Sequence, residues 1–139
     1  MQQLVLDNNS LFSIMNPKSA SAYLFVSIRV NFIAPEFIKS ELEKHKEECL
    51  TKSELSEHEF EIRQTEVEES VKFFKSVEYE DFLEKVEELI PDPDDIDFLA
   101  LALSTNSAIW SNDPHLIKQS LVKVFTTADL LKMFLDNEI

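Results

Sequence analysis

Short apolar runs alternate along the chain with longer stretches in which apolar residues recur every three or four positions. Each short run is bounded by polar turn residues, which is the pattern of a buried strand. The runs that predict strands are residues 4–6, 31–34, 108–110 and 121–125. The stretches between them predict helices. The chain therefore has the alternation of an α/β protein, in which helices cover both faces of a parallel sheet.

Several predicted helices begin with a residue that can cap them. Ser19 or Ser21 can cap the helix that follows the first proline. Asp92 suits the N-cap of a later helix, because Pro93 fits the first helical position and acidic residues in the first turn complement the helix dipole. Residues 98–103 of that helix are apolar nearly all round. We expect this helix to be buried on two sides.

Residues 47–97 form an acidic middle segment that contains nineteen of the 27 acidic residues. Ser56 and Glu59 match a capping box, in which each side chain binds an exposed amide at the helix start. The apolar positions that then recur at helical spacing are Val67, Val71, Phe74 and Val77. Residues 79–90 repeat the pattern. We therefore expect an amphipathic helical insertion whose acidic side chains form the solvated face.

The composition excludes several classes of site. The length of 139 residues predicts a single domain, residues 1–139. The chain has no glycine, which phosphate-cradling loops and dinucleotide-binding folds both need. Cys49 is the only cysteine, which excludes an internal disulfide and a cysteine cage for zinc. No apolar run reaches the ~20 residues of a membrane helix, and residues 1–7 lack the basic start of a signal peptide, so we expect a cytoplasmic protein.

Four acidic residues stand where predicted strands end or helices begin. Asp7 and Asp113 each follow a strand directly. Asp95 lies in the first turn of a helix, and Glu41 lies on the helix after the second strand. Sites in parallel sheets form beyond the carboxyl ends of the strands, so the four carboxylates can meet at one edge. Clustered carboxylates raise one another's pKa values unless a hard cation such as Mg²⁺ or Mn²⁺ binds them. Such an ion can activate water, which predicts hydrolysis of a phosphate ester.

Other residues of chemical interest have simpler interpretations. Asp92 is expected to be a helix cap and Asp94 to be solvated, while Asp97 is compatible with either a structural or a functional role. Most acidic residues of any protein lie on its surface, so spacing alone does not assign a ligand. The three histidines show no metal-binding spacing, and no Ser–His or Cys–His pair indicates a covalent intermediate.

The net charge of −14 is unfavourable for binding nucleic acid, but it is unevenly distributed. The acidic residues are concentrated in the middle segment, whereas residues 1–46 and 98–139 are each close to neutral. An anionic substrate would therefore approach a face built from the two ends of the chain.

Four blocks of the sequence resemble the PIN-domain ribonucleases, which include the VapC-like toxins. The blocks are LVLDNNSL, APEFIKSEL, DPDDIDFLALAL and AIWSNDPHL, and they follow one another in the family's order. The resemblance implies a three-layer α/β/α sandwich with a central, mostly parallel sheet and a helical insertion in the middle. It also implies an acidic cluster that binds Mg²⁺ or Mn²⁺ and cleaves RNA.

The resemblance also assigns roles to the four acids. Carried over by position, the family's acidic residues fall on Asp7, Glu41, Asp95 and Asp113. We expect the three aspartates to ligate metal directly or through water. Glu41 has a longer side chain and is expected to hold a second metal ion or to orient the attacking water.

Three neighbouring polar residues complete the comparison. Asn9 stands at the family's usual asparagine, and Ser111 matches the hydroxyl that precedes the last aspartate. Both are candidate substrate-binding residues, and Ser111 can also hold a carboxylate. Asn8 departs from the pattern, because the family commonly has threonine or serine there. Asn8 can still form hydrogen bonds, so this departure affects the details of the site more than its ability to bind metal.

The leading hypothesis is a metal-dependent endoribonuclease, and one form of it is the toxin of a toxin–antitoxin pair. The resemblance then implies a small antitoxin that covers the acidic site, and a homodimer. The alternative is a catalytically silent PIN-like scaffold for protein interactions. A third hypothesis, a receiver-type phosphoacceptor domain, needs an acidic pair after the first strand and a lysine after the last. Asp7 is followed by Asn8, and no lysine follows Phe125, so this third function is disfavoured.

Overall fold

The computed structural model describes residues 1–139 and contains one five-stranded sheet. The strands are β1 (Gln3–Leu6), β2 (Asn31–Pro35), β3 (Val71–Phe74), β4 (Ala108–Trp110) and β5 (Val124–Phe125). They lie in the order β3-β2-β1-β4-β5, and every neighbouring pair is parallel. The predicted parallel sheet is confirmed.

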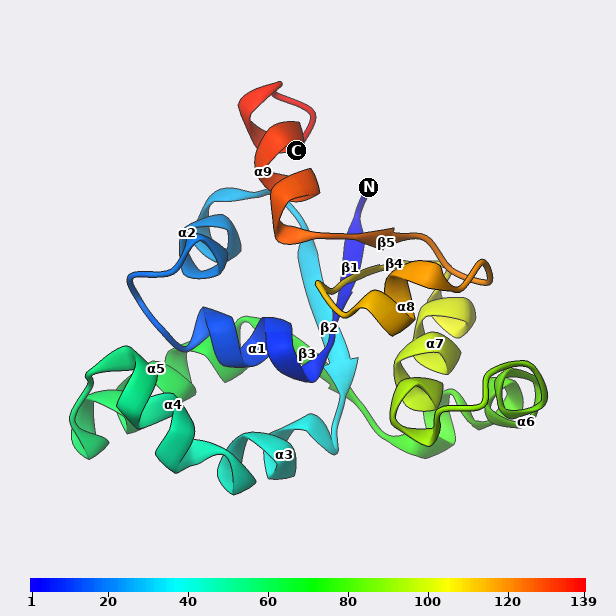
Figure 1. Cartoon of the computed structure of the whole chain (residues 1–139), viewed down its shortest axis with the longest axis horizontal. Coiled ribbons are helices and arrows are strands. Elements are labelled where there is room, and N and C mark those ends of the chain that lie inside the picture. Colours follow the sequence, from blue (N-terminus) through cyan, green and yellow to red (C-terminus); the bar gives the residue numbers. More distant parts are fainter.

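Helices cover both faces of this sheet. They are α1 (Asn8–Ile14), α2 (Ala20–Ser27), α3 (Ile38–Lys44), α4 (Lys46–Ser53), α5 (Glu57–Glu69), α6 (Glu80–Leu89), α7 (Pro93–Thr105), α8 (Pro114–Lys118) and α9 (Thr127–Leu135), with a 3-10 turn η1 (Ser76–Glu78). Figure 1 shows α7, with α6 outside it, on one side of the strands and α1 and α2 on the other. The chain is thus a three-layer α/β/α sandwich, as predicted. None of its helices combines the length and apolar character needed to cross a membrane.

The capping residues begin the helices as their chemistry predicts. Ser19, rather than Ser21, caps α2, since its hydroxyl accepts a hydrogen bond from the backbone of the first turn. Ser56 and Glu59 form the predicted capping box of α5. Asp92 caps α7, where Pro93 occupies the first turn. Each cap satisfies a backbone N–H group at the helix start that has no partner within the helix.

One apolar core of 30 buried residues lies between the layers. Residues 4–6 of β1 are fully buried, because β1 is the central strand and has helices on both sides. Trp110 at the end of β4 is also fully buried, and its indole N–H donates a hydrogen bond to the hydroxyl of Thr127 at 3.0 Å. Trp110 therefore belongs to the core.

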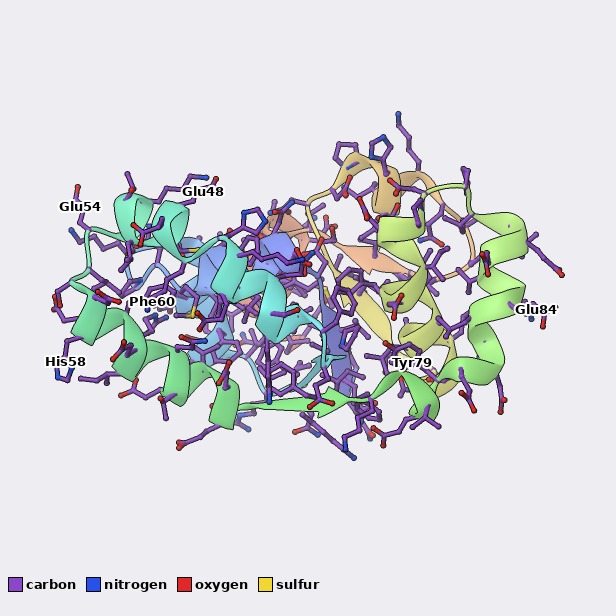
Figure 2. All side chains as sticks on the ribbon, turned by 90° about the horizontal axis from the view of Figure 1, so that it is seen from below. Glu48, Glu54, His58, Phe60, Tyr79 and Glu84 are labelled. Atoms are coloured by element: carbon purple, nitrogen blue, oxygen red, sulfur yellow. The ribbon has the colours of Figure 1, made fainter.

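The middle segment is not wholly helical, which corrects the prediction made from its apolar spacing. Helix α5 ends at Glu69, and Val71–Phe74 forms the edge strand β3, paired with β2. Figure 2 shows this strand running from the end of α5 towards Tyr79. The residues have the β-branched and aromatic character of a strand, and β2 provides a hydrogen-bonding edge for them. A run of four residues is too short for its apolar spacing to distinguish helix from strand.

The last strand is shorter than predicted. Only Val124 and Phe125 pair with β4, although residues 121–125 are mostly apolar. The side-chain carbonyl of Gln119 accepts hydrogen bonds from the backbone N–H groups of Leu121 and Val122, at 2.8 and 3.0 Å. A glutamine side chain therefore replaces the neighbouring strand as the hydrogen-bond partner of this backbone, and the segment turns instead of pairing.

Helices α4 and α5 form an arm that packs against α1. Figure 2 shows Phe60 pointing inwards from α5, whereas Glu54 and His58 lie at the outer end of the arm; Phe60 is fully buried. The guanidinium of Arg63 on α5 donates hydrogen bonds to the backbone carbonyls of Ile14 and Met15, at 2.6 to 3.2 Å. Arg63 thereby satisfies carbonyls at the end of α1, which have no partner within the helix.

Candidate active site

The four acids selected from the sequence line one pocket. Its volume is about 920 Å³, and Asp7, Glu41, Asp95 and Asp113 are all among its lining residues. Asp7 follows β1 and Asp113 follows β4, which are adjacent parallel strands. Asp95 enters from the first turn of α7, and Glu41 from α3. The edge formed by the carboxyl ends of the strands is therefore where the pocket lies, as the topology requires.

Asp7 is held in place by two neighbours. One carboxylate oxygen accepts a hydrogen bond from the backbone N–H of Ser10 at 2.8 Å, which makes Asp7 the N-cap of α1. The other oxygen accepts a hydrogen bond from the hydroxyl of Ser111. Asp7 is only 4% exposed. Burial raises the pKa of Asp7, the hydrogen bonds from Ser111 and Ser10 lower it, and the charge of Asp113 raises it further; the net direction is upwards.

Ser111 connects two of the candidate ligands. Its hydroxyl donates to Asp7 and accepts a hydrogen bond from the backbone N–H of Asp113 at 2.9 Å. Ser111 itself is fully buried. A donor that faces only Asp7 fixes the rotamer of that carboxylate and favours its ionised form. Ser111 thus holds a carboxylate, one of the two roles considered for it.

Asp95 is the most perturbed acid of the pocket. It is 6% exposed, and its burial, together with the charges of Asp92 and Asp113, raises its pKa to about 6. No hydrogen bond to Asp95 lowers its pKa against the effect of burial. Of its charged neighbours, only His115 lowers this pKa. The ionised form of Asp95 is therefore held at a cost in free energy at neutral pH.

Asp113 and Glu41 are more accessible, with side chains 29% and 24% exposed. Asp113 caps α8 by accepting from the backbone N–H of His115 at 2.9 Å, and the imidazole of His115 lies 3.4 Å away. His115 therefore makes a local contact with Asp113. Glu41 lies 3.1 Å from the ammonium of Lys44 and 4.0 Å from the imidazole of His45.

Three further acids line the pocket, Glu48, Asp94 and Asp97. Asp94 is exposed, as predicted. Asp97 accepts a hydrogen bond from the buried hydroxyl of Tyr79 at 2.7 Å, and the pKa of Tyr79 is raised first by burial and then by this bond. A structural partner for Asp97 is thus present.

Asn8 and Asn9 both line the pocket next to Asp7. Asn9 is exposed and can reach a bound molecule. The side-chain oxygen of Asn8 is buried and has no hydrogen-bond partner. A buried acceptor without a donor is costly, so this oxygen is available to a bound water or ion.

One lysine and the single cysteine also line the pocket. The basic residues Lys18, Arg29, Lys39, Lys118 and Lys123 do not line the pocket. The lysine that does is Lys52 of α4, which binds Glu48 at 3.0 Å. Cys49 also lines the pocket, but burial raises the pKa of its thiol, which disfavours a nucleophilic thiolate. Helix α4 lies in the segment expected to be helical, but no pattern within that segment indicates that it lines the pocket.

A family model for the PIN domain matches residues 5–133 of the chain. This chain belongs to the PIN-domain family. The match contains all four candidate acids, the second half of β1 and the whole of strands β2 to β5. PIN domains are generally nucleases that use divalent metal ions. A sequence search of curated proteins finds no match.

The pocket of this PIN domain has the donor set of a hard-cation site. Its candidate ligands are carboxylate oxygens, with the unpartnered amide oxygen of Asn8 beside them. Burial raises the pKa values of Asp7 and Asp95, and the charge of Asp113 raises both further, so a bound cation would stabilise their ionised forms. No three acidic, histidine or cysteine side chains approach closely enough in this structure to hold one ion between them. Mg²⁺ fits such a set because it keeps several waters and needs only one or two direct carboxylates.

Proposed function

We propose that this PIN domain is a Mg²⁺- or Mn²⁺-dependent endoribonuclease that hydrolyses phosphodiester bonds of RNA. The observation that supports this proposal is the pocket that Asp7, Glu41, Asp95 and Asp113 share, in which burial and mutual repulsion raise the pKa of two of the four. Membership of a family of nucleases supports the same reaction class.

Each residue of the proposed site has a role that its position allows. Asp7, Asp95 and Asp113 hold the metal, directly or through water. When bound, the ion supplies Lewis acidity at the phosphate and lowers the pKa of a bound water. The hydrogen bond from Ser111 favours the ionised form of Asp7 and fixes the orientation of its carboxylate. Glu41 is partly exposed on a long side chain, so it can orient the attacking water and accept its proton.

The proposal is tested by cleavage of RNA. Purified protein is incubated with a mixture of labelled single-stranded RNAs and Mn²⁺, with and without EDTA. Cleavage should require Mn²⁺ and should fall at least 100-fold in Asp7→Asn, because the most deeply buried candidate ligand is neutralised. Asp81→Asn is the matched control, since Asp81 is an exposed acid of α6 that does not line the pocket.

Three outcomes would contradict the proposal. Cleavage that persists in EDTA or in Asp7→Asn comes from a contaminating nuclease. An equal loss of RNA cleavage in Asp7→Asn and Asp81→Asn would indicate a general effect of the net charge of the protein. If diverse RNAs stay intact with Mn²⁺, the alternative of a catalytically silent scaffold gains support, with the acidic helices as its binding surface.

The wider biological role follows from the resemblance and belongs to the same proposal. We propose a single cytoplasmic domain that acts as the toxin of a toxin–antitoxin pair and forms a homodimer. An antitoxin segment with a basic side chain would neutralise the acidic pocket and block RNA. Sedimentation velocity of the purified protein tests the dimer. The test of the antitoxin is a short reading frame beside the gene whose product binds the protein and stops cleavage.

A further inference from the structure

Two ring side chains flank Glu41 on the same face of its helix. Phe37 stands one turn before Glu41 and His45 one turn after it, and all three line the pocket. Figure 1 shows α3 next to α1, across from α7, so this helix forms one wall of the space at the strand ends. The residue proposed to orient the attacking water thus lies between two rings.

Each ring is supported from behind by a second aromatic residue. Phe37 packs against Phe98 with ring centroids 5.6 Å apart, and His45 packs against Phe12 at 5.2 Å. Phe98 is almost completely buried, whereas Phe37 is 37% exposed and the His45 side chain is 46% exposed. Both outer rings are therefore held by packing on one side and remain accessible on the other. A ring held in this way loses little conformational entropy when a flat ligand stacks on it.

The charges of the pocket make such rings necessary for binding RNA. Seven acidic residues line the pocket, but Lys52 is the only lysine or arginine among the lining residues, and it is paired with Glu48. Affinity for a nucleic acid usually comes from cations that neutralise phosphates. Apart from a bound metal ion, this pocket offers few cations that could neutralise phosphates. Stacking of bases on rings is the other general source of affinity for single strands.

We infer that Phe37 and His45 are stacking platforms for the two bases on either side of the cleaved phosphate. The inference rests on the proposed function, because the phosphate is placed by the acids. His45 follows Phe37 by eight positions, which places the platforms roughly 12 Å apart along the helix axis. Neighbouring bases in a stacked strand are about 3.4 Å apart along the axis. Both platforms can be occupied only when the two bases are unstacked, so the substrate is single-stranded RNA or an unpaired loop, and a duplex is excluded.

The inference is tested with short RNAs that lack one base. The substrates are a six-nucleotide RNA with one preferred cleavage site and two versions with an abasic nucleotide on either side of it. Loss of either base should raise KM for wild-type cleavage with Mn²⁺ by roughly 5- to 150-fold and leave kcat within a few-fold. Phe37→Leu and His45→Leu should each raise KM similarly, and each should abolish the effect of one of the two abasic substitutions. Phe37→Tyr should restore wild-type KM, because it restores the ring.

Binding measurements separate this inference from the proposed reaction. Fluorescence anisotropy with Ca²⁺ in place of Mn²⁺ gives the affinity of the same RNAs without requiring turnover. Tyr23→Leu is the control, since Tyr23 is 55% exposed on α2 and does not line the pocket. Binding should weaken with Phe37→Leu and His45→Leu but not with Tyr23→Leu, and it should depend only weakly on salt because few cations contact phosphate.

Each outcome has a definite meaning. If RNA is cleaved with Mn²⁺ but neither the abasic substrates nor the ring variants change KM, the stacking inference is wrong and the proposed nuclease stands. If no RNA is cleaved but binding with Ca²⁺ still requires both rings, the nuclease proposal fails and the stacking surface stands. Equal cleavage of duplex and single-stranded RNA, or a steep salt dependence of binding, would also overturn the inference.

Discussion

Replacing Asp95 by asparagine tests whether the pocket holds uncompensated negative charge. Asp95 is 6% exposed, and burial with the neighbouring charges of Asp92 and Asp113 raises its pKa to about 6. An aspartate in the unfolded chain has a pKa of about 3.9. At pH 7 the ionised side chain is therefore less stable in the folded protein than in the unfolded chain. Removing the charge should stabilise the metal-free protein.

The size of this stabilisation follows from the pKa difference. A difference of roughly two pH units corresponds to about 3 kcal/mol at pH 7, which is an upper limit. Solvent at the mouth of the pocket screens part of the interaction, and the helix N-terminus stabilises a negative charge by roughly 0.3–1 kcal/mol. The asparagine amide must also be buried. We therefore expect Asp95→Asn to raise the free energy of unfolding by about 1–2 kcal/mol at pH 7 in EDTA.

The effect should depend on pH with a definite sign. Between about pH 4 and pH 6 the folded wild type retains a proton that its unfolded chain has released, so the wild type loses stability as the pH rises through this window. The variant has no such group. The extra free energy of unfolding of Asp95→Asn over wild type should therefore be absent at pH 4, grow up to about pH 6 and then stay constant. A divalent ion should reverse the order at pH 7, because binding stabilises the folded wild type by about 2.7 kcal/mol at 100 times Kd and the variant by less.

Urea denaturation followed by tryptophan fluorescence measures these differences. The only tryptophan, Trp110, is fully buried and reports the loss of the core directly. Titrations at pH 4, 5, 6 and 7, with EDTA or with Mn²⁺, give the free energy of unfolding of wild type, Asp95→Asn and the exposed-acid control Asp81→Asn. If Asp95→Asn is no more stable than wild type in EDTA at pH 7, or if its advantage is the same at pH 4, the argument from buried charge is refuted.

Three further substitutions test individual contacts. Ser111→Ala removes the hydrogen bond to Asp7 and should weaken Mn²⁺ binding by about 10- to 100-fold in a calorimetric titration; unchanged affinity would mean that the hydroxyl does not orient the carboxylate. Arg63→Met should lower the free energy of unfolding by about 2–3 kcal/mol, because two carbonyls at the end of α1 lose a charged donor; a loss below 0.5 kcal/mol in urea titrations would show that water replaces it. Tyr79→Phe should cost about 1 kcal/mol but leave Mn²⁺-dependent cleavage within a few-fold, because Asp97 is not one of the four proposed ligands. A larger loss of kcat would give Asp97 a part in the reaction.

The parts of the fold that the sequence predicts are those governed by local chemistry. β1, β2 and β4 were found because each is a short apolar run that ends in a turn residue or a proline. The capping residues were found because a cap is a contact within three residues. The edge strand β3 was missed because its partner β2 lies far away in the sequence. Its hydrogen bonds to β2, rather than its own apolar spacing, decide that it is a strand.

The positions of the four acids follow from the same reasoning at the level of topology. Asp7 and Asp113 come directly after parallel strands, so once the strands pair the two residues must lie at the same edge. The walls of the pocket do not follow in this way. Phe37 meets Phe98 of α7 and His45 meets Phe12 of α1 only in the folded chain, and no pattern within these segments indicates the pairing.

The environment of an acid is also set by residues that are remote in sequence. Asp7 can be selected as a candidate from the strand that precedes it, but its hydrogen bond comes from Ser111, 104 positions away. On α1, the hydroxyl of Ser10 donates to the backbone carbonyl of Trp110 at 2.7 Å, which ties the cap of the helix to β4. These contacts hold the carboxylate of Asp7 rigid while burial raises its pKa. A rigid, buried acid next to Asp113 destabilises the metal-free protein, and a bound cation would relieve that cost. The buried position of Asp7 beside Asp113 therefore favours a role in cation binding in addition to its role as a helix cap.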